Sequence, residues 1–153
     1  MKKRDLLISV AIPLLTGVFA TLLSGEGMAF FVNLNKPPLT PPAWVFPVVW
    51  TLLYTMMGIA AYLVTITDGD GVDEALLFYG IQLLVNFFWP IFFFGFGWYL
   101  VSFLWLVLLW VLIFHTIRLF AQISKPAASL MVPYLVWVTF AGYLNLGFWW
   151  LNR

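Results

Sequence analysis

Apolar residues gather along this chain into five long runs, which short polar segments separate. The runs cover residues 6–23, 43–66, 75–95, 98–117 and 130–150, and none of them contains Asp, Glu, Lys or Arg. Each run is close to the ~20 residues that a helix needs to cross the hydrocarbon core of a bilayer. Lipid cannot satisfy backbone amides, and the alternation typical of barrel strands is absent, so the runs must be helices. The pattern predicts an all-α membrane protein, a single bundle of five transmembrane helices within residues 1–153.

The connection between the first two runs, residues 24–42, is much longer than the other connections. Long loops in compact proteins are usually functional or disordered, and apolar residues such as Phe31 and Leu34 argue against disorder. Pro41 and Pro42 suit the end of a loop and the first turn of a helix, where an amide donor would be unpartnered anyway. We therefore expect this segment to fold over the outer end of the bundle and cap a pocket there.

Composition and charge agree with a membrane protein and indicate its orientation. The chain is 64% hydrophobic and 8% charged, whereas soluble domains carry roughly a quarter charged residues. If every run crosses the membrane, five basic residues share one side: Lys2, Lys3, Arg4, Arg118 and Lys125. The other side has Lys36 and Arg153. Basic loops are retained in the cytoplasm, so we expect a cytoplasmic N-terminus and an external C-terminus.

Aromatic and amide side chains recur at helical spacing in three of the runs. Phe46, Trp50 and Tyr54 follow one another every four residues and would share one helix face. Two further stripes occupy the third and fifth runs: Tyr79, Gln82, Asn86 and Trp89, and Tyr134, Trp137, Ala141 and Asn145. Together these faces would enclose a slot walled by rings and edged by amides, the usual makeup of a ligand pocket. The same pattern also fits hydrogen bonds between helices, and it leaves both interpretations open.

Several kinds of chemistry lack the residues they need. The chain has no cysteine, which excludes disulfides and thiolate metal sites. His115 has no second ligand within the spans, so we expect no metal site and no cofactor. A carboxylate that would relay protons or bind a coupling ion is missing from every run. Basic patches for nucleic acid are missing as well.

Four ordered blocks resemble the translocator protein family, also called tryptophan-rich sensory proteins or peripheral-type benzodiazepine receptors. The blocks are GEG at 25–27, KPPLTPPAWVFPVVWTLLY at 36–54, QLLVNFFWPIFF at 82–93 and PYLVWVTFAGYLN at 133–145. This resemblance implies a five-helix membrane protein that is often a homodimer. The short chain and the departure from the sterol motif, described next, favour a bacterial plasma membrane. Animal relatives carry a sterol-recognition pattern at the end of the fifth helix, but here Leu146 follows Asn145 and Trp150 replaces a basic residue. That departure puts sterol recognition in doubt.

The resemblance also implies a ligand and a set of contact residues. Relatives bind tetrapyrroles such as protoporphyrin IX beneath the first loop, and isoquinoline carboxamides and benzodiazepines in the same pocket. The positions that line it in the family are Trp50, Asn86, Trp89, Trp137, Ala141 and Asn145. From the residue pattern we add Tyr54, Gln82 and Tyr134, and we expect Lys36 in the loop to meet a propionate.

Three functions remain, and we place binding first. The first is a membrane receptor or sensor that binds a tetrapyrrole or another hydrophobic small molecule. The second is a light-dependent enzyme that degrades porphyrin, with Trp50 and Trp137 as the reacting residues. The third is a carrier that moves porphyrin or lipidic compounds between membrane lipid and a partner.

Overall fold

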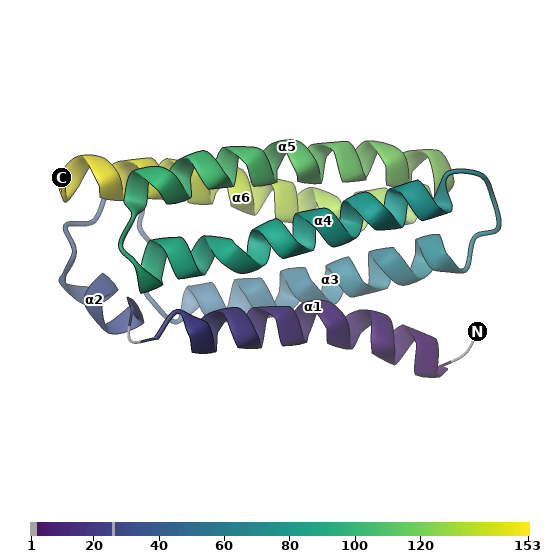
Figure 1. Ribbon diagram of the computed structural model, residues 1–153, viewed down its shortest axis with the longest axis horizontal. Helices are drawn as coiled ribbons and strands as arrows, with labels where there is room; N and C mark the ends of the chain where they lie inside the picture. The colour runs from purple at the N-terminus through teal and green to yellow at the C-terminus, as the bar shows by residue number, and fades with distance from the viewer. Residues whose placement is uncertain (1–2, 26) are drawn as a thin grey trace.

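The computed structural model, which describes residues 3–25 and 27–153, contains five long helices and one short helix (Figure 1). The long helices are α1 (Lys3–Leu23), α3 (Val45–Thr65), α4 (Val72–Pro90), α5 (Tyr99–Ile123) and α6 (Lys125–Leu151). α4 continues into a π-helical turn, η1 (Ile91–Gly95), and the short helix α2 (Gly27–Asn33) lies in the first connection. All five long helices, α4 together with η1, are long and apolar enough to span a membrane, which confirms the predicted bundle.

Four of the five long helices extend beyond their apolar runs into capping and polar residues, whereas α3 lies within its run of residues 43–66 and begins at Val45. α6 begins at Lys125 rather than at residue 130, since the Ser124 hydroxyl accepts a hydrogen bond from the amide of Ala127 and Pro126 fits the first turn. α4 begins at Val72, directly after Gly71, whose positive φ of 85° suits glycine. Lys2 and Glu26, from the basic N-terminal segment and the GEG motif, lie outside the described residues.

The five long helices pack in a ring with the order α1, α3, α6, α5, α4 and back to α1. The N-terminus and the C-terminus lie at opposite ends of the bundle (Figure 1). α1 is the most peripheral helix, because Pro13 and Ala20 are its only buried residues. The core therefore forms mainly among the other four helices, where Met57, Phe120 and Tyr134 are fully buried.

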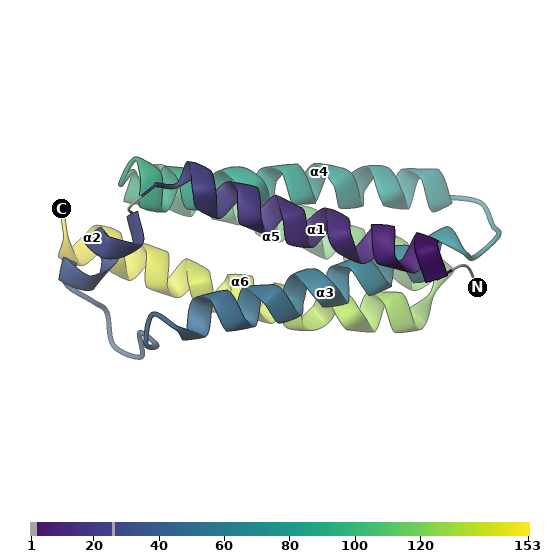
Figure 2. The ribbon, with the colours of Figure 1, turned by 90° about the horizontal axis from the view of Figure 1, so that it is seen from below.

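Two glycines set the approach of α1 to α3. A Cβ atom at Gly58 would collide with the backbone of Val10, and one at Gly17 would collide with the ring of Tyr54. α1 and α3 therefore touch closely from the half of the bundle that holds the N-terminus as far as Gly17 and Tyr54. Towards the opposite end, which we call the outer end, the two helices diverge (Figure 2).

The first connection folds over the outer end of the bundle, as expected. Phe31 of α2 is buried, and its ring lies 5.5 Å from that of Phe46, 6.0 Å from Phe94 and 5.2 Å from Phe148. This packing holds α2 against the ends of three spanning segments.

The loop after α2 is tied to the end of α6. The Asn35 amide donates to Asn152 Oδ1 and Asn152 Nδ2 donates to the Asn35 carbonyl, both at 2.9 Å. Pro37 lies against Gly147, where a side chain would meet Pro37 Cβ at 2.6 Å. We call residues 35–38 and their contacts on α6 the loop anchor.

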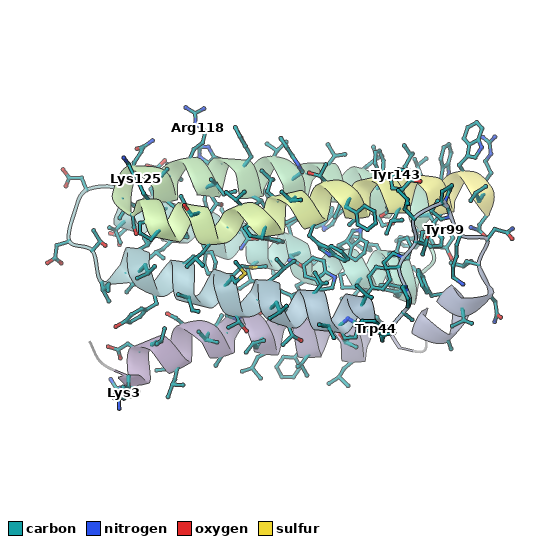
Figure 3. The ribbon with its side chains drawn as sticks, turned by 180° about the vertical axis from the view of Figure 1, so that it is seen from behind. Lys3, Trp44, Tyr99, Arg118, Lys125 and Tyr143 are labelled. Carbon is teal, nitrogen blue, oxygen red and sulfur yellow. The ribbon has the colours of Figure 1, made fainter. Side chains whose placement is uncertain are left out.

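Charged side chains gather at the two ends of the bundle. Lys3, Arg118 and Lys125 lie at the end that holds the N-terminus (Figure 3). Arg153 closes the chain at the outer end, where its guanidinium lies 3.7 Å from the ring centre of Trp150. The five crossings therefore divide the basic residues between two ends in the way that the sequence predicts.

Candidate functional site

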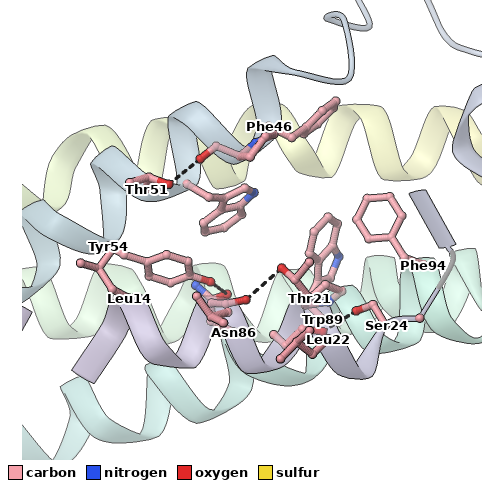
Figure 4. A pocket seen from close by; sticks show the side chains of 17 residues that line it. Leu14, Thr21, Leu22, Ser24, Phe46, Thr51, Tyr54, Asn86, Trp89 and Phe94 are labelled. Carbon is pink, nitrogen blue, oxygen red and sulfur yellow. Dashed lines mark hydrogen bonds between the residues drawn. The ribbon is translucent and has the colours of Figure 1, made fainter. Parts of the chain in front are cut away.

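A cavity of about 630 Å³ lies between the outer halves of α1, α3 and α4 (Figure 4). Its volume falls within the range of roughly 300–1,000 Å³ that is typical of small-molecule pockets. Aromatic rings dominate one side, and small residues form the other. The lining residues are Leu14, Gly17, Val18, Ala20, Thr21, Leu22, Ser24, Gly25, Phe46, Pro47, Trp50, Thr51, Tyr54, Asn86, Trp89, Pro90 and Phe94.

The aromatic side follows from helical spacing on α3 and from the turn that ends α4. Phe46, Trp50 and Tyr54 stack along one face of α3, and the Trp50 ring lies 5.4 Å from Tyr54. Trp89 of α4 approaches Trp50 to 6.4 Å between ring centres. The π-helical turn η1 then presents Phe94, which packs edge-on against Trp89 at 6.0 Å. π-Helical turns are frequent at functional sites, and here the turn completes one wall of the cavity.

The opposite side is open because α1 presents small side chains to it. Gly17, Ala20, Ser24 and Gly25 all line the cavity, and none of them is large enough to fill it. Ser24 Oγ donates to the carbonyl of Ala20 at 2.6 Å, so its hydrogen is already used within α1.

Two threonines on facing helices also use their hydroxyl hydrogens within their own helices. Thr21 Oγ1 donates to the carbonyl of Gly17 at 2.9 Å, and Thr51 Oγ1 donates to that of Pro47 at 2.7 Å. These hydroxyl groups offer a ligand only their acceptor lone pairs. The 17 lining residues carry no charge, so the described part of the pocket favours a neutral, apolar surface.

A line of hydrogen bonds fixes the one amide that reaches the pocket. Tyr54 Oη donates to Asn86 Oδ1 at 3.1 Å, and Asn86 Nδ2 donates to Tyr134 Oη at 2.6 Å. Tyr134 Oη in turn donates to Gln82 Oε1 at 2.8 Å. Asn86 is only 1% exposed, so its orientation is held between α3 and α6 at the bottom of the cavity.

The structure brings four of the ten predicted ligand-binding residues into the pocket lining. These four are Trp50, Tyr54, Asn86 and Trp89. Gln82, Tyr134 and Asn145 lie behind them as hydrogen-bond partners. Trp89 Nε1 donates to Asn145 Oδ1 at 3.0 Å, and Asn145 Nδ2 donates to the Tyr99 carbonyl at 2.7 Å. Gln82, Tyr134 and Asn145 therefore serve hydrogen bonds between helices, whereas Tyr54, Asn86 and Trp89 form such bonds and also line the cavity.

Trp137, Ala141 and Lys36 lie outside the pocket lining. Trp137 packs against Phe46 at 6.0 Å, and its buried indole nitrogen has no hydrogen-bond partner within the described structure. Ala141 is buried in α6. Lys36 is exposed on the loop, donates to the Val32 carbonyl at 3.0 Å and lies 5.6 Å from the centre of the Phe31 ring. Trp50 and Trp137, the pair considered for photochemistry, thus occupy different places relative to the cavity.

The contribution of α1 to the pocket is absent from the predicted set. Small residues recur every four positions in the first run, but this spacing is also typical of plain helix packing. Phe46 carried a signal, because it starts the aromatic stripe of the second run, whereas Phe94 carried none. Which helix faces the aromatic stripe depends on the order of the helices around the bundle, and local sequence patterns do not give that order.

Comparisons with known proteins cover the whole bundle. Residues 9–151 match the model of the TspO/MBR family. The chain is 40% identical to the tryptophan-rich protein TspO of Chlorobaculum tepidum over an alignment of 157 positions, which covers 99% of each chain. It is 38% identical to the translocator protein of Bos taurus over 135 residues, 84% of this chain and 78% of that one. The tryptophan-rich sensory protein of Cereibacter sphaeroides is 40% identical over 116 residues, 76% of this chain and 72% of that protein.

Proposed function

Because this chain belongs to the TspO/MBR family of integral membrane proteins, we propose that it is a membrane receptor or sensor for a flat, hydrophobic ligand. The ligand is a tetrapyrrole such as protoporphyrin IX, and isoquinoline carboxamides or benzodiazepines are synthetic substitutes for it. It binds in the cavity between α1, α3 and α4.

The observation that carries this proposal is the cavity of about 630 Å³ with five aromatic residues in its lining. A flat apolar ligand gains ~25 cal/mol for each Å² of apolar surface that it removes from water. Rings of Trp50, Trp89 and Phe94 offer such a surface, and Asn86 supplies one oriented polar group. Few polar groups in a mostly apolar pocket are typical of small-molecule sites.

The carboxylates of a porphyrin would remain at the outer end. The described lining has no charged residue to pair with them, whereas Lys36 is exposed on the loop above Phe31. A macrocycle bound between the aromatic walls, with its propionates directed towards Lys36, satisfies both ends of the molecule. Replacing Lys36 would then weaken protoporphyrin IX but leave its dimethyl ester unaffected.

The proposal is tested by titrating protoporphyrin IX into the detergent-solubilised protein and following porphyrin absorbance. We expect Trp50→Ala to weaken binding by roughly tenfold or more, because about 2 kcal/mol of aromatic contact is lost. Trp110→Ala is the matched control, since Trp110 is exposed on α5, bonds Thr139 and does not line the cavity. Equal affinities of the two variants would contradict the proposed site.

Illumination of the same samples separates binding from the photochemical alternative. If porphyrin binds in the dark, and if it decays in light no faster with the protein than without it, the activity is binding alone. Faster decay that Trp50→Phe abolishes, with dark binding retained, would instead support the enzyme.

We further propose that the protein lies in a bacterial plasma membrane, as a homodimer, with its N-terminus in the cytoplasm. The family supports the membrane setting. The grouping of Lys3, Arg118 and Lys125 at one end supports the orientation, because basic ends are retained inside.

A further inference from the structure

The cavity has an exposed edge that faces sideways from the bundle. Six of its lining residues are exposed. We call the five that lie on α1 and α3 the mouth: Val18, Thr21 and Leu22 on α1, and Pro47 and Thr51 on α3. The sixth, Gly25, lies in the connection after α1. Val18 is 54% exposed and Leu22 is 69% exposed, whereas Tyr54 and Trp89 at the back of the cavity are each 7% exposed. The cavity therefore deepens from an open lateral edge into the bundle.

The mouth lies within the membrane-spanning part of both helices. Thr51 is six residues beyond the start of α3 at Val45, which places it ~9 Å from that helix end at 1.5 Å per residue. Val18 is five residues from the end of α1 at Leu23, or about 7.5 Å by the same measure. Helices of this length cross a hydrocarbon core ~30 Å thick, so the mouth faces the half of the bilayer next to the outer end, which is the outer leaflet in the proposed orientation.

Close contact restricts the opening to this half of the bundle. The Gly58 contact with Val10 and the Gly17 contact with Tyr54 bring α1 against α3 below the mouth. Above it, Phe31 packs on Phe46 and Phe94, both of which line the cavity. The cavity is closed by these contacts below and above the mouth, so the open route into it lies between α1 and α3.

The polar groups of the mouth are compatible with lipid. Thr21 and Thr51 both donate their hydroxyl hydrogens to carbonyl groups of their own helices, so neither leaves an unpaired donor in hydrocarbon. α1 can shift at moderate cost, because little of its surface is buried against the rest of the bundle.

We infer that the ligand enters this pocket sideways from the outer leaflet of the bilayer, between the outer halves of α1 and α3. The part of the ligand that enters first is uncharged and apolar, since charge is costly in hydrocarbon. A planar amphiphile enters with its apolar edge first and leaves its charged groups at the headgroup level. This inference rests on the proposed function for the identity of the pocket.

The direction in which the mouth opens is measured without any ligand. The chain has no cysteine, so Thr51→Cys carries a single bimane label after reconstitution into phospholipid vesicles. We expect strong quenching by phospholipids with a spin label on the acyl chain and weak quenching by iodide. Leu39→Cys is the control, because Leu39 is 80% exposed on the outer loop and its label should respond to iodide. Iodide quenching at residue 51 as strong as at residue 39 would overturn the inference.

Entry itself is tested by closing the two candidate routes separately. Thr21→Cys with Thr51→Cys, joined by a bis-maleimide whose linker contains a disulfide, closes the mouth. Asn35→Cys with Asn152→Cys, whose parent residues are in contact, fastens the loop anchor instead. The measured quantity is the rate at which vesicle-borne protoporphyrin IX dimethyl ester loads the protein.

We expect the linked mouth to slow loading roughly tenfold or more and reduction of the linker to restore the rate, because a closed route gates access. The fastened loop should load at the rate of the unmodified protein. Loading through the linked mouth at the unmodified rate would overturn the inference. If unmodified protein fails to bind any porphyrin, the proposed function fails, while the quenching measurement still decides where the mouth opens.

Discussion

At the scale of single residues, the amides and phenols of this bundle divide between two roles. Asn86 lines the cavity and also joins Tyr54 to Tyr134, whereas Gln82 and Asn145 serve as partners behind the wall. Hydrogen bonds between membrane helices contribute little each, about 0.6 kcal/mol on average and up to ~1.7 kcal/mol. The network therefore orients the cavity wall more than it stabilises the fold.

Tyr54→Phe removes the hydroxyl that donates to Asn86 Oδ1. We expect the free energy of unfolding to fall by about 0.6–1.7 kcal/mol and porphyrin affinity to fall with it, because the Asn86 amide loses one of its two fixed partners. Unfolding by denaturing detergent, followed by circular dichroism, measures the first effect. Tyr143→Phe is the control, since its hydroxyl donates to the Pro38 carbonyl at the exposed loop anchor. Pocket affinity that drops equally in both variants would contradict the role of Asn86.

At the scale of elements, the contact between α1 and α3 shapes the pocket. Gly58 brings α3 against the backbone of Val10, and the helices separate from there towards the outer end (Figure 2). Small residues are common where membrane helices approach closely, because backbones can then pack directly. The cavity is the space that this one-sided contact leaves between the two outer halves.

Gly58→Ala places a methyl group against the Val10 backbone, which cannot yield as a flexible side chain would. We expect a loss of about 1–3 kcal/mol in unfolding free energy, the usual cost of overpacking. Gly80→Ala, in α4 with nothing near its added Cβ, is the matched control and should gain up to ~1 kcal/mol from helix propensity. The same detergent unfolding experiment compares the stabilities of the two variants. A Gly58→Ala variant more stable than Gly80→Ala would show that the α1–α3 contact is loose.

At the scale of the whole molecule, the two ends of the bundle carry different residues. Lys3, Arg118 and Lys125 lie at one end, and the loop anchor closes the other (Figure 3). If the basic end faces the cytoplasm, the loop anchor, the mouth and the pocket all belong to the outer half of the membrane.

A reporter fusion checks this orientation. Alkaline phosphatase joined after Arg153 should be active in a bacterial host, because the enzyme works only outside the cytoplasm, and green fluorescent protein joined there should stay dark. Replacing Lys3, Arg4, Arg118 and Lys125 with Asn should lower phosphatase activity, since basic residues set the orientation. Fluorescence of the C-terminal green fluorescent protein in the unsubstituted chain would place the pocket in the inner leaflet instead.

The sequence alone determined the five spanning helices, the loop over the outer end, the division of basic residues and the aromatic stripe of Phe46, Trp50 and Tyr54. All of them follow from local features of the sequence: the lengths of the apolar runs and of the loop, the positions of the basic residues, and the sharing of a helix face by residues three or four apart. Helix ends were less accurate, since Ser124 and Gly71 extend helices past the apolar runs.

Only the tertiary structure decided which face meets which neighbour. The ring order places α1 across from Trp50 and Trp89, whereas Trp137 and Ala141 lie outside the cavity lining. It also assigns Gln82 and Asn145 to hydrogen bonds behind the wall. The physical reason is that a hydrophobic run fits lipid on any side, so the position of each helix around the ring depends on contacts such as Gly58 with Val10, between residues far apart in the chain.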